Sequence, residues 1–410
     1  MIDKGATTFM ILATSLVMLM TPGLAFFYGG LGNKKNILNI MMQSFVSVGL
    51  TTVLWFSFGY SLCFSGTLAS GTDLWGILGN LDKAFLNGIT PKTMMVGKPF
   101  PEYVFFAYQM MFAIITPALI TGAFINRVTF KSYVIFLIFW QILVYYPFVH
   151  MIWGGGILQA WGVLDFAGGI VVHATAGFAA LVATIYVGKR KGGEHEPNNI
   201  PLVAIGTTLL WFGWYGFNAG SELDMNDITV AAFVNTDVSA SFAAVTWLII
   251  EWNRGKRKPT LIGLMTGAVA GLATITPASG YVTVGAAACI GIMSGMICYL
   301  AVEFKNYMKW DDALDVWGVH GVGGVLGTIL LGVFASTAIN PSTLNGLFYG
   351  GGFELITKEI VALIFSIIWA SSFTWGMLHA INRFVPVKVS DAVQKGGLDL
   401  HIHGEVARAI

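Results

Sequence analysis

The sequence contains few charged residues. Only 10% of its 410 residues are Asp, Glu, Lys or Arg, whereas 56% are hydrophobic. Soluble domains carry about 25% charged residues, so this chain lacks the polar side chains to cover a water-facing surface. Its apolar content also excludes disorder. We therefore expect an all-α integral membrane protein and not a soluble enzyme.

Cysteines and catalytic motifs are also scarce. The three cysteines, Cys63, Cys289 and Cys298, are an odd number and lie in apolar stretches, so we interpret them as packing residues and not as a disulfide framework or metal site. The sequence has no HExxH, CxxC pair, P-loop or GxSxG motif. We expect no enzymatic activity, no cofactor and no metal, and the formal charge of +1 indicates no nucleic-acid partner.

Long hydrophobic runs are abundant instead. A helix that crosses the hydrocarbon core needs about 20 mainly apolar residues. Eleven transmembrane helices are predicted, over residues 6–28, 38–64, 103–126, 132–149, 166–187, 200–219, 228–250, 260–276, 281–304, 316–335 and 355–382. The first run follows Asp3 and Lys4 and has neither a basic n-region nor a small-residue cleavage site. We therefore interpret it as a retained span and not a signal peptide.

Lysines and arginines are distributed unequally between the predicted loops. An odd number of spans places the two termini on opposite sides of the membrane. If the N-terminus is outside, the outer side contains only Lys4, Lys83, Lys92, Lys98 and Lys358, and the other 17 of the 22 basic residues lie inside. By the positive-inside rule, this predicts a multi-pass protein of the cell membrane with an outer N-terminus and a cytoplasmic C-terminus.

The fifth and tenth predicted spans share a motif. Residues 172–177 (VHATAG) and 319–324 (VHGVGG) both read V-H-x-x-x-G, and an aspartate precedes each. The two copies are offset by five spans, so the halves would have opposite topology, which is the inverted-repeat plan of many transporters. We therefore divide the transmembrane domain, residues 1–382, into three parts and add a cytoplasmic tail. They are a first repeat over 6–187, a second over 200–335, a last helix over 355–382 and the tail over 383–410.

His173 and His320 are ionisable residues inside predicted spans, where such side chains are costly and usually face a cavity. One buried histidine can simply bind a backbone carbonyl, but two at equivalent places of a repeat favour a shared lumen. Imidazole both donates and accepts hydrogen bonds. Two such rings in a dry pore suit a substrate that releases a proton, and they do not suit a hydrated metal cation.

Aromatic residues gather at the outer ends of two spans. Trp153 precedes three glycines, and the run from Trp211 to Ser221 is rich in aromatic side chains. Each tryptophan alone could be an interfacial anchor. Together, aromatic faces can attract a cation by about 0.5–2 kcal/mol, and Ser221 can accept a hydrogen bond from it. Phe112 is either a further wall of such a site or a core residue.

Aspartates near the two histidine spans have alternative interpretations. Asp165 either caps the helix predicted to begin at Phe166 or provides a fixed negative charge that attracts a cation. Asp311, Asp312 and Asp315 precede the tenth span and are either helix caps or contacts of the inner loops. The basic connectors are topology signals or a dock for a cytosolic regulator.

The motifs together resemble those of the Amt/Mep/Rh ammonium transporter family. The matching stretches run in family order and are residues 22–30 (PGLAFFYGG), 150–156 (HMIWGGG), 165–173 (DFAGGIVVH), 216–221 (GFNAGS), 276–281 (TPASGY), 315–321 (DVWGVHG), 397–399 (GLD) and 403–405 (HGE). The resemblance implies the ammonium transporter fold: two inverted five-helix repeats plus a final helix. It also implies a homotrimer with one pore per subunit.

The resemblance implies roles for the outer residues. Trp153, Phe112 and Ser221 would form an ammonium recruitment site, and Phe112 with Phe217 would form the gate beneath it. The combination of Trp153 with Ser221 is typical of the Amt branch.

It also implies roles within the pore. His173 and His320 would line the pore and relay a proton, with Trp214 beside them and Asp165 supporting the site. Electrogenic passage of ammonium and neutral passage of ammonia are both compatible with this arrangement.

The chain departs from the family pattern at two places. Met110 and Met111 replace small residues before the gate phenylalanine, which would narrow or reshape the vestibule. Residues 125–127 read INR where the family usually has AER, which removes a carboxylate near the inner face. Partners implied by the resemblance are ammonium or ammonia, membrane lipid, and a PII-type cytosolic regulator or a fused signalling domain. The alternative functions are an ammonium sensor with little transport and an Rh-like neutral gas channel.

Overall fold

The computed structural model describes residues 2–191, 196–254 and 258–407. Within these ranges the chain is helical, and no β-strand longer than an isolated bridge occurs. Three basic residues used to predict the orientation, Lys256, Arg257 and Arg408, lie outside the described residues. Ten helical segments of the described chain are long and apolar enough to cross a membrane, and a shorter apolar helix, α11, joins them. The all-α membrane fold is therefore confirmed.

The first half of the chain contains five spans. They are α1 (Lys4–Leu31); α2 (Ile37–Leu54), which continues through η1 (Trp55–Gly59) into α3 (Tyr60–Phe64); α4 (Glu102–Phe124); α5 (Phe130–Trp140), which continues through η3 (Gln141–Tyr145) into α6 (Tyr146–Trp153); and η4 (Gly169–Ala174), which continues into α8 (Thr175–Val187). A short helix, α7 (Ile157–Trp161), lies between the fourth and fifth spans.

The second half contains the remaining spans. They are α9 (Ile200–Ala219), α10 (Asp227–Arg254), α11 (Leu261–Ile275), α12 (Val284–Tyr307), η6 (Trp317–Gly321) continuing into α13 (Val322–Phe334), and α14 (Glu354–Asn382). The tail contains α15 (Asp391–Gly396) and the π-turn η8 (Asp399–His403). Three short 3-10 turns, η2 (Ala84–Leu86), η5 (Gly220–Glu222) and η7 (Leu347–Tyr349), lie in loops.

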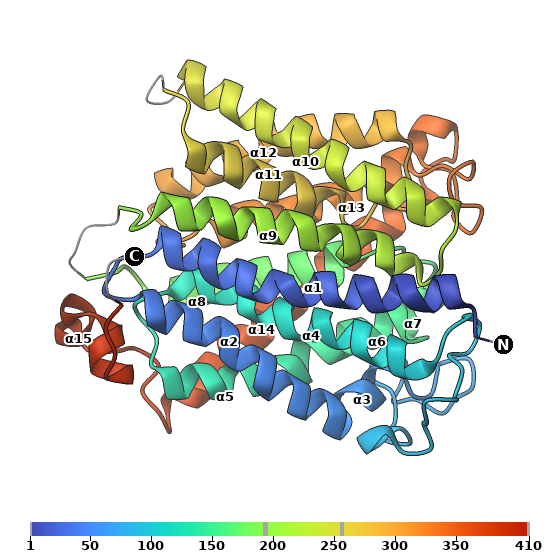
Figure 1. Ribbon diagram of the computed structural model, residues 1–410, viewed down its shortest axis with the longest axis horizontal. Helices are drawn as coiled ribbons and strands as arrows, with labels where there is room; N and C mark the ends of the chain where they lie inside the picture. The colour runs from blue at the N-terminus through green and yellow to red at the C-terminus, as the bar shows by residue number, and fades with distance from the viewer. Residues whose placement is uncertain (1, 192–195, 255–257, 408–410) are drawn as a thin grey trace.

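The spans run roughly parallel, and the chain ends lie at opposite ends of the bundle (Figure 1). The N-terminus lies at the same end as the long loop between α3 and α4, whereas α15 and the tail lie at the other end. This arrangement agrees with an odd number of spans. Helix α1 packs along α9, and α10 packs against α11 and α12.

Among the helix boundaries that differ from the prediction by three or four residues, two have a clear local cause. The fourth span was expected to end at residue 149, but α6 continues to Trp153 because the polar His150 is buried and hydrogen-bonded instead of reaching water. The fifth span was expected to begin at Phe166, but its helical turns begin at Gly169. The carboxylate of Asp165 binds the backbone N–H groups there, which fixes the later start.

Each histidine of the repeated motif lies in a π-turn, His173 in η4 and His320 in η6. These two segments cross closely because the glycine that ends each motif copy faces the other segment. A Cβ on Gly177 would lie 2.2 Å from the Cα of Gly321, and one on Gly324 would lie 2.9 Å from the Cβ of His173. The V-H-x-x-x-G pattern therefore brings the two rings together by removing side chains at the crossing.

Candidate substrate pore

One vestibule opens at the end of the bundle that contains the N-terminus, and we call it the outer vestibule after the orientation predicted from the sequence. It has a volume of about 530 Å³, and its lining includes Phe112, Trp153, Asp165 and Ser221. The indole Nε1–H of Trp153 donates to the carbonyl oxygen of Asp165 at 2.7 Å. The indole ring meets the Phe112 ring edge-on, with centroids 6.0 Å apart. All three predicted recruitment residues therefore border one space.

Ser221 presents acceptor lone pairs to this vestibule. Its hydroxyl donates to the carbonyl oxygen of Phe217 at 2.9 Å, so its hydrogen is committed to the backbone. Tyr108 fixes the same turn, because its hydroxyl lies 2.9 Å from the carbonyl oxygens of Gly216 and Phe217 and 3.3 Å from Ser221 Oγ. Sequence reasoning missed Tyr108, although it precedes Phe112 by one helical turn on the same face of α4.

Phe112 and Phe217 close the floor of the vestibule. Their rings stack at a centroid distance of 4.1 Å and an interplanar angle of 28°, and each residue is only 1% exposed. Gln109 and Phe112 are among the vestibule residues, whereas Met110 and Met111 are not among the described residues that line it. The expectation that the two methionines narrow the vestibule is not supported by this lining.

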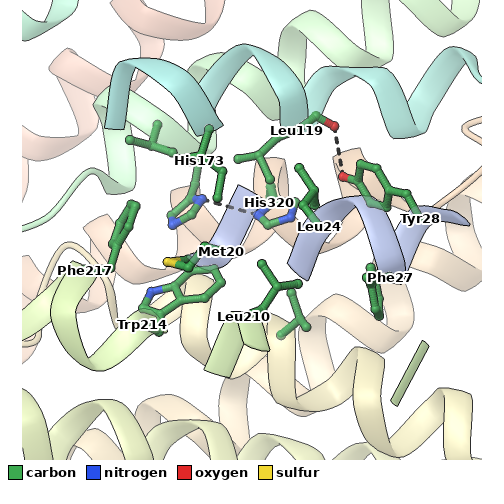
Figure 2. Close-up of a pocket in the computed structure, with 13 residues that line it drawn as sticks. Met20, Leu24, Phe27, Tyr28, Leu119, His173, Leu210, Trp214, Phe217 and His320 are labelled. Carbon is green, nitrogen blue, oxygen red and sulfur yellow. Dashed lines mark hydrogen bonds between the residues drawn. The ribbon is translucent and has the colours of Figure 1, made fainter. Parts of the chain in front are cut away.

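His173 and His320 stack beneath the phenylalanines. Their ring centroids are 5.2 Å apart at 21°, and the two Nδ1 atoms are 3.3 Å apart. Figure 2 shows both rings in one space with Met20 and Leu24. The narrow cavity around them has a volume of only about 10 Å³, which is close to the minimum for one water molecule.

Hydrogen-bond partners determine which ring nitrogens carry hydrogen in the neutral pair. Thr276 Oγ1 donates its hydrogen to the carbonyl oxygen of Leu272 at 2.8 Å. It therefore accepts from Trp214 Nε1–H at 2.9 Å and from His173 Nε2–H at 3.3 Å. His173 Nδ1 is then an acceptor, and His320 Nδ1 donates to it. Nε2 remains the acceptor nitrogen of His320.

A second vestibule lies on the inner side of His320. It has a volume of about 200 Å³ and is lined by Phe27, Tyr28, Asp315 and Val319, among others, together with His320. Because His320 borders both this space and the narrow cavity, the histidine pair separates an outer from an inner chamber. Trp214 lies beside the pair, with its ring 5.5 Å from that of His173.

The carboxylate of Asp165 binds backbone N–H groups and is not an unpaired charge in the vestibule. Its two oxygens accept the N–H groups of four successive residues, Gly168 to Val171, at 2.6–3.1 Å. This is an extended helix cap of the segment that carries His173. Of the two interpretations of Asp165, the geometry supports the cap.

The three inner aspartates bind different partners. Arg190 makes a bidentate contact with Asp311, and although burial opposes the shift, Arg190 and Arg127 lower the pKa of Asp311 to about 2. The Asp312 carboxylate accepts the N–H of Trp317 at 2.8 Å and so caps η6. Asp315 forms an ion pair with Lys305. Both interpretations made from the sequence, caps and inner-loop contacts, therefore apply.

Two residues of this site could not be assigned from the sequence. Thr276 was noted only as the first residue of a matching stretch, and its contact with Trp214 and His173 joins α11 to two other spans. Tyr108 belongs to none of the motifs recognised in the sequence. Both act through contacts between distant segments, which spacing along one helix does not reveal.

The fold and the site define a class of protein. Ten or more membrane-spanning helices surround a narrow apolar passage that contains two histidines and joins two chambers. This arrangement is typical of a transporter or channel for a small solute.

Comparison with known sequences identifies the family. The Ammonium Transporter Family matches residues 8–408, and the chain belongs to it. It is 44% identical to Ammonium transporter 1 of Dictyostelium discoideum over 99% of this chain and 87% of that protein. It is 42% identical to the ammonium transporter of Bacillus subtilis over 99% of this chain and 98% of that protein.

Solved structures have the same fold. The crystal structure of Candida albicans Mep2 has a TM-score of 0.87 and 33% sequence identity, covering 95% of this chain and 87% of that one. A structure described as a sensor Amt protein has a TM-score of 0.87 and 28% identity, covering 97% of both chains. The curated relatives are named ammonium transporters, so the chain is an ammonium transporter of the membrane, and the sensor alternative is not favoured.

Proposed function

We propose that this transporter carries its substrate in two chemical forms. Ammonium binds in the outer vestibule, loses a proton there, and crosses the narrow passage as ammonia. The observation that supports this order is the histidine pair. It lies in an apolar cavity of about 10 Å³, between chambers of about 530 and 200 Å³, where a neutral molecule passes more easily than an ion.

Recruitment depends on Trp153, Phe112 and Ser221. Aromatic faces stabilise a cation by about 0.5–2 kcal/mol, more when water is excluded. The hydroxyl oxygen of Ser221 accepts an N–H hydrogen bond from ammonium, because its own hydrogen is held by Phe217 O. Potassium, which has no N–H groups, forms no such hydrogen bond.

Deprotonation removes the main barrier to entry. Transfer of an ion from water into an apolar interior costs several kcal/mol, and burial disfavours a charged form. Ammonium avoids this cost by releasing a proton, whereas potassium has no such route. The gate of Phe112 and Phe217 keeps water out of the path at this point.

The histidines then accompany ammonia through the passage. In the tautomers assigned above, Thr276 holds the Nε2–H of His173 and the two Nδ1 atoms share a hydrogen, so Nε2 of His320 is the acceptor left for an N–H group of ammonia. The released proton either follows through the linked Nδ1 atoms or stays outside. The first route is electrogenic, and the second is neutral. No bond to the substrate other than N–H changes, so the chain is not an enzyme.

Replacement of one histidine tests the proposal. His173→Ala and His320→Ala should each abolish ammonium flux in liposomes or convert the passage into a leak that admits potassium. His379→Ala is the control, because His379 is exposed on α14. Unchanged flux and selectivity in both pore variants would contradict a role for the pair.

The oligomer that we propose is a homotrimer with one pore per subunit, as the family resemblance implies. Its support is a carboxylate near the middle of α10. Asp237 accepts hydrogen bonds from Tyr215 at 2.7 Å and Trp211 at 3.1 Å, yet it is only half-buried. A carboxylate facing lipid is costly, so a second copy of the chain covers it. Native mass spectrometry should find a trimer, and a monomer alone would contradict this assignment.

The proposal also includes the orientation and the repeat division. The N-terminus is outside, the tail over 383–410 is cytoplasmic, and the repeats cover 6–187 and 200–335. A PII-type regulator or a fused signalling domain would contact the inner face, where the Lys191 N–H donates to Gln394 of the tail at 3.1 Å. A protease added to sealed vesicles should reach the tail only when the inner face is exposed.

A further inference from the structure

His150 is a buried residue that the transport mechanism does not use. It lies on α6 one turn before Trp153, and it is 0% exposed. Its Nδ1 atom is 2.9 Å from the carbonyl oxygen of Cys63, at the end of the second span. Its Nε2 atom is 3.1 Å from the carboxylate of Asp73, whose side chain is 2% exposed.

Both ring nitrogens of His150 face acceptors. A backbone carbonyl can only accept, and an ionised carboxylate can only accept. The two contacts hold the ring between the end of the second span and the outer loop. Because a buried polar group that loses its partner is costly, His150 and Asp73 specify one position of the outer loop relative to α6.

The loop that carries Asp73 clamps the backbone that follows Trp153. The Leu68 N–H donates to Gly155 O at 3.0 Å, and the Ile157 N–H donates to Gly76 O at 2.9 Å. A Cβ on Gly156 would lie 2.4 Å from Gly76 O. The loop residues that make these contacts, Leu68 and Gly76, lie on either side of Asp73 in the sequence.

His150 also stabilises this turn through its own backbone carbonyl group. Its carbonyl oxygen accepts the N–H groups of Gly154 and Gly156, each at 3.0 Å. A Cβ on Gly154 would lie 2.7 Å from the Nδ1 atom of His150. Trp153 is therefore fixed by its indole bond to Asp165 on one side and by the His150-centred turn on the other.

We propose that His150 and Asp73 are a positioning pair for Trp153, which sets the affinity of the outer vestibule for ammonium without touching the substrate. This inference rests on the proposed recruiting role of Trp153. Because the pair acts on the vestibule and not on the histidine passage, its loss changes the ammonium concentration at half-maximal flux and leaves the maximal flux nearly unaltered.

A double-mutant cycle on the full chain in liposomes tests the proposal. Flux is measured against ammonium concentration for Asp73→Ala, Trp153→Leu and the double variant. Asp82→Ala is the matched control, because Asp82 is an exposed aspartate of the same loop. If Asp73→Ala does not assemble, Asp73→Asn, which keeps the size of the side chain, replaces it in the cycle.

Asp73→Ala should raise the half-saturating ammonium concentration by about threefold to tenfold, equivalent to about 0.7–1.4 kcal/mol. On the Trp153→Leu background it should add almost nothing, because residues that act through one contact are not additive. An unshifted half-saturation, a full additional increment in the double variant, or a loss confined to the maximal flux would overturn the proposal. If Trp153→Leu itself causes no shift, the recruiting role is what fails.

Discussion

The hydroxyl group of Thr276 connects two pore residues. It accepts from Trp214 Nε1 at 2.9 Å and lies 3.3 Å from His173 Nε2, while its hydrogen is held by Leu272 O. The tautomer of His173, and through it that of His320, follows from this contact. The residue at the C-terminal cap of α11 therefore determines which nitrogens of the pair carry hydrogen.

Replacement of Thr276 by valine keeps the shape and removes the hydroxyl. We expect Thr276→Val to lower ammonium flux at least severalfold, because His173 loses the partner that fixes its tautomer and the buried Trp214 N–H is left unpaired, at a cost of about 1–3 kcal/mol. The measurement is flux in liposomes beside a thermal unfolding curve. Thr276→Ser, which keeps the hydroxyl, is the control and should retain most of the flux. Equal losses in both variants would contradict the explanation.

At the scale of helices, the residue pattern predicted much of the architecture. Hydropathy was sufficient for the spans, since each needs about 20 apolar residues in sequence, and the repeated V-H-x-x-x-G motif singled out His173 and His320, whose rings stack in the folded chain. The π-turns, the cap at Asp165 and the late start of the fifth span were not predictable. They depend on which backbone groups bind a side chain, and hydropathy does not encode that.

The crossing of the two histidine segments gives a test at this scale. Gly177→Ala would place a Cβ 2.2 Å from backbone Cα of Gly321, so the segments must separate and the Nδ1–Nδ1 contact of 3.3 Å should break. Flux should fall strongly, and the folded yield on size exclusion should drop. Gly376→Ala on α14 meets open space and should behave like the parent chain. A fully active Gly177→Ala variant would disprove the close crossing.

Asp312 lies in the inner connector before η6, and its titration should make the stability of the fold depend on pH. Burial raises the pKa of Asp312 to about 6, with Lys305 opposing and Asp315 adding to the shift. An unfolded Asp titrates near about 3.9. Between these values the folded chain binds more protons, so stability should decrease as pH rises from about 4 to about 6 and then level off.

Asp312→Asn isolates this contribution. The variant cannot titrate at this position, so its thermal unfolding midpoint in detergent should fall less than that of the parent chain between about pH 4 and about pH 7. The difference between the two slopes is the quantity to compare, because other groups titrate in both proteins. Identical slopes would show that Asp312 does not titrate in this range.

At the scale of the whole molecule, two chambers face a passage whose described lining consists of the histidine pair, Tyr28, Trp214 and apolar side chains. The outer chamber has a volume of about 530 Å³ and the space around the rings about 10 Å³, and a stacked phenylalanine pair separates them. Sequence resemblance named most of these residues, and the long-range contacts of Tyr108, Thr276 and Asp73 needed the folded chain. Selectivity in this account follows from the chemistry of the permeant and not from its size.

The most direct test is the flux of ammonium, methylammonium and potassium through the purified protein in liposomes under equal gradients. We expect flux of ammonium and methylammonium, which can release a proton, and none of potassium, which cannot. Potassium flux comparable to that of ammonium in the unmodified protein would contradict it.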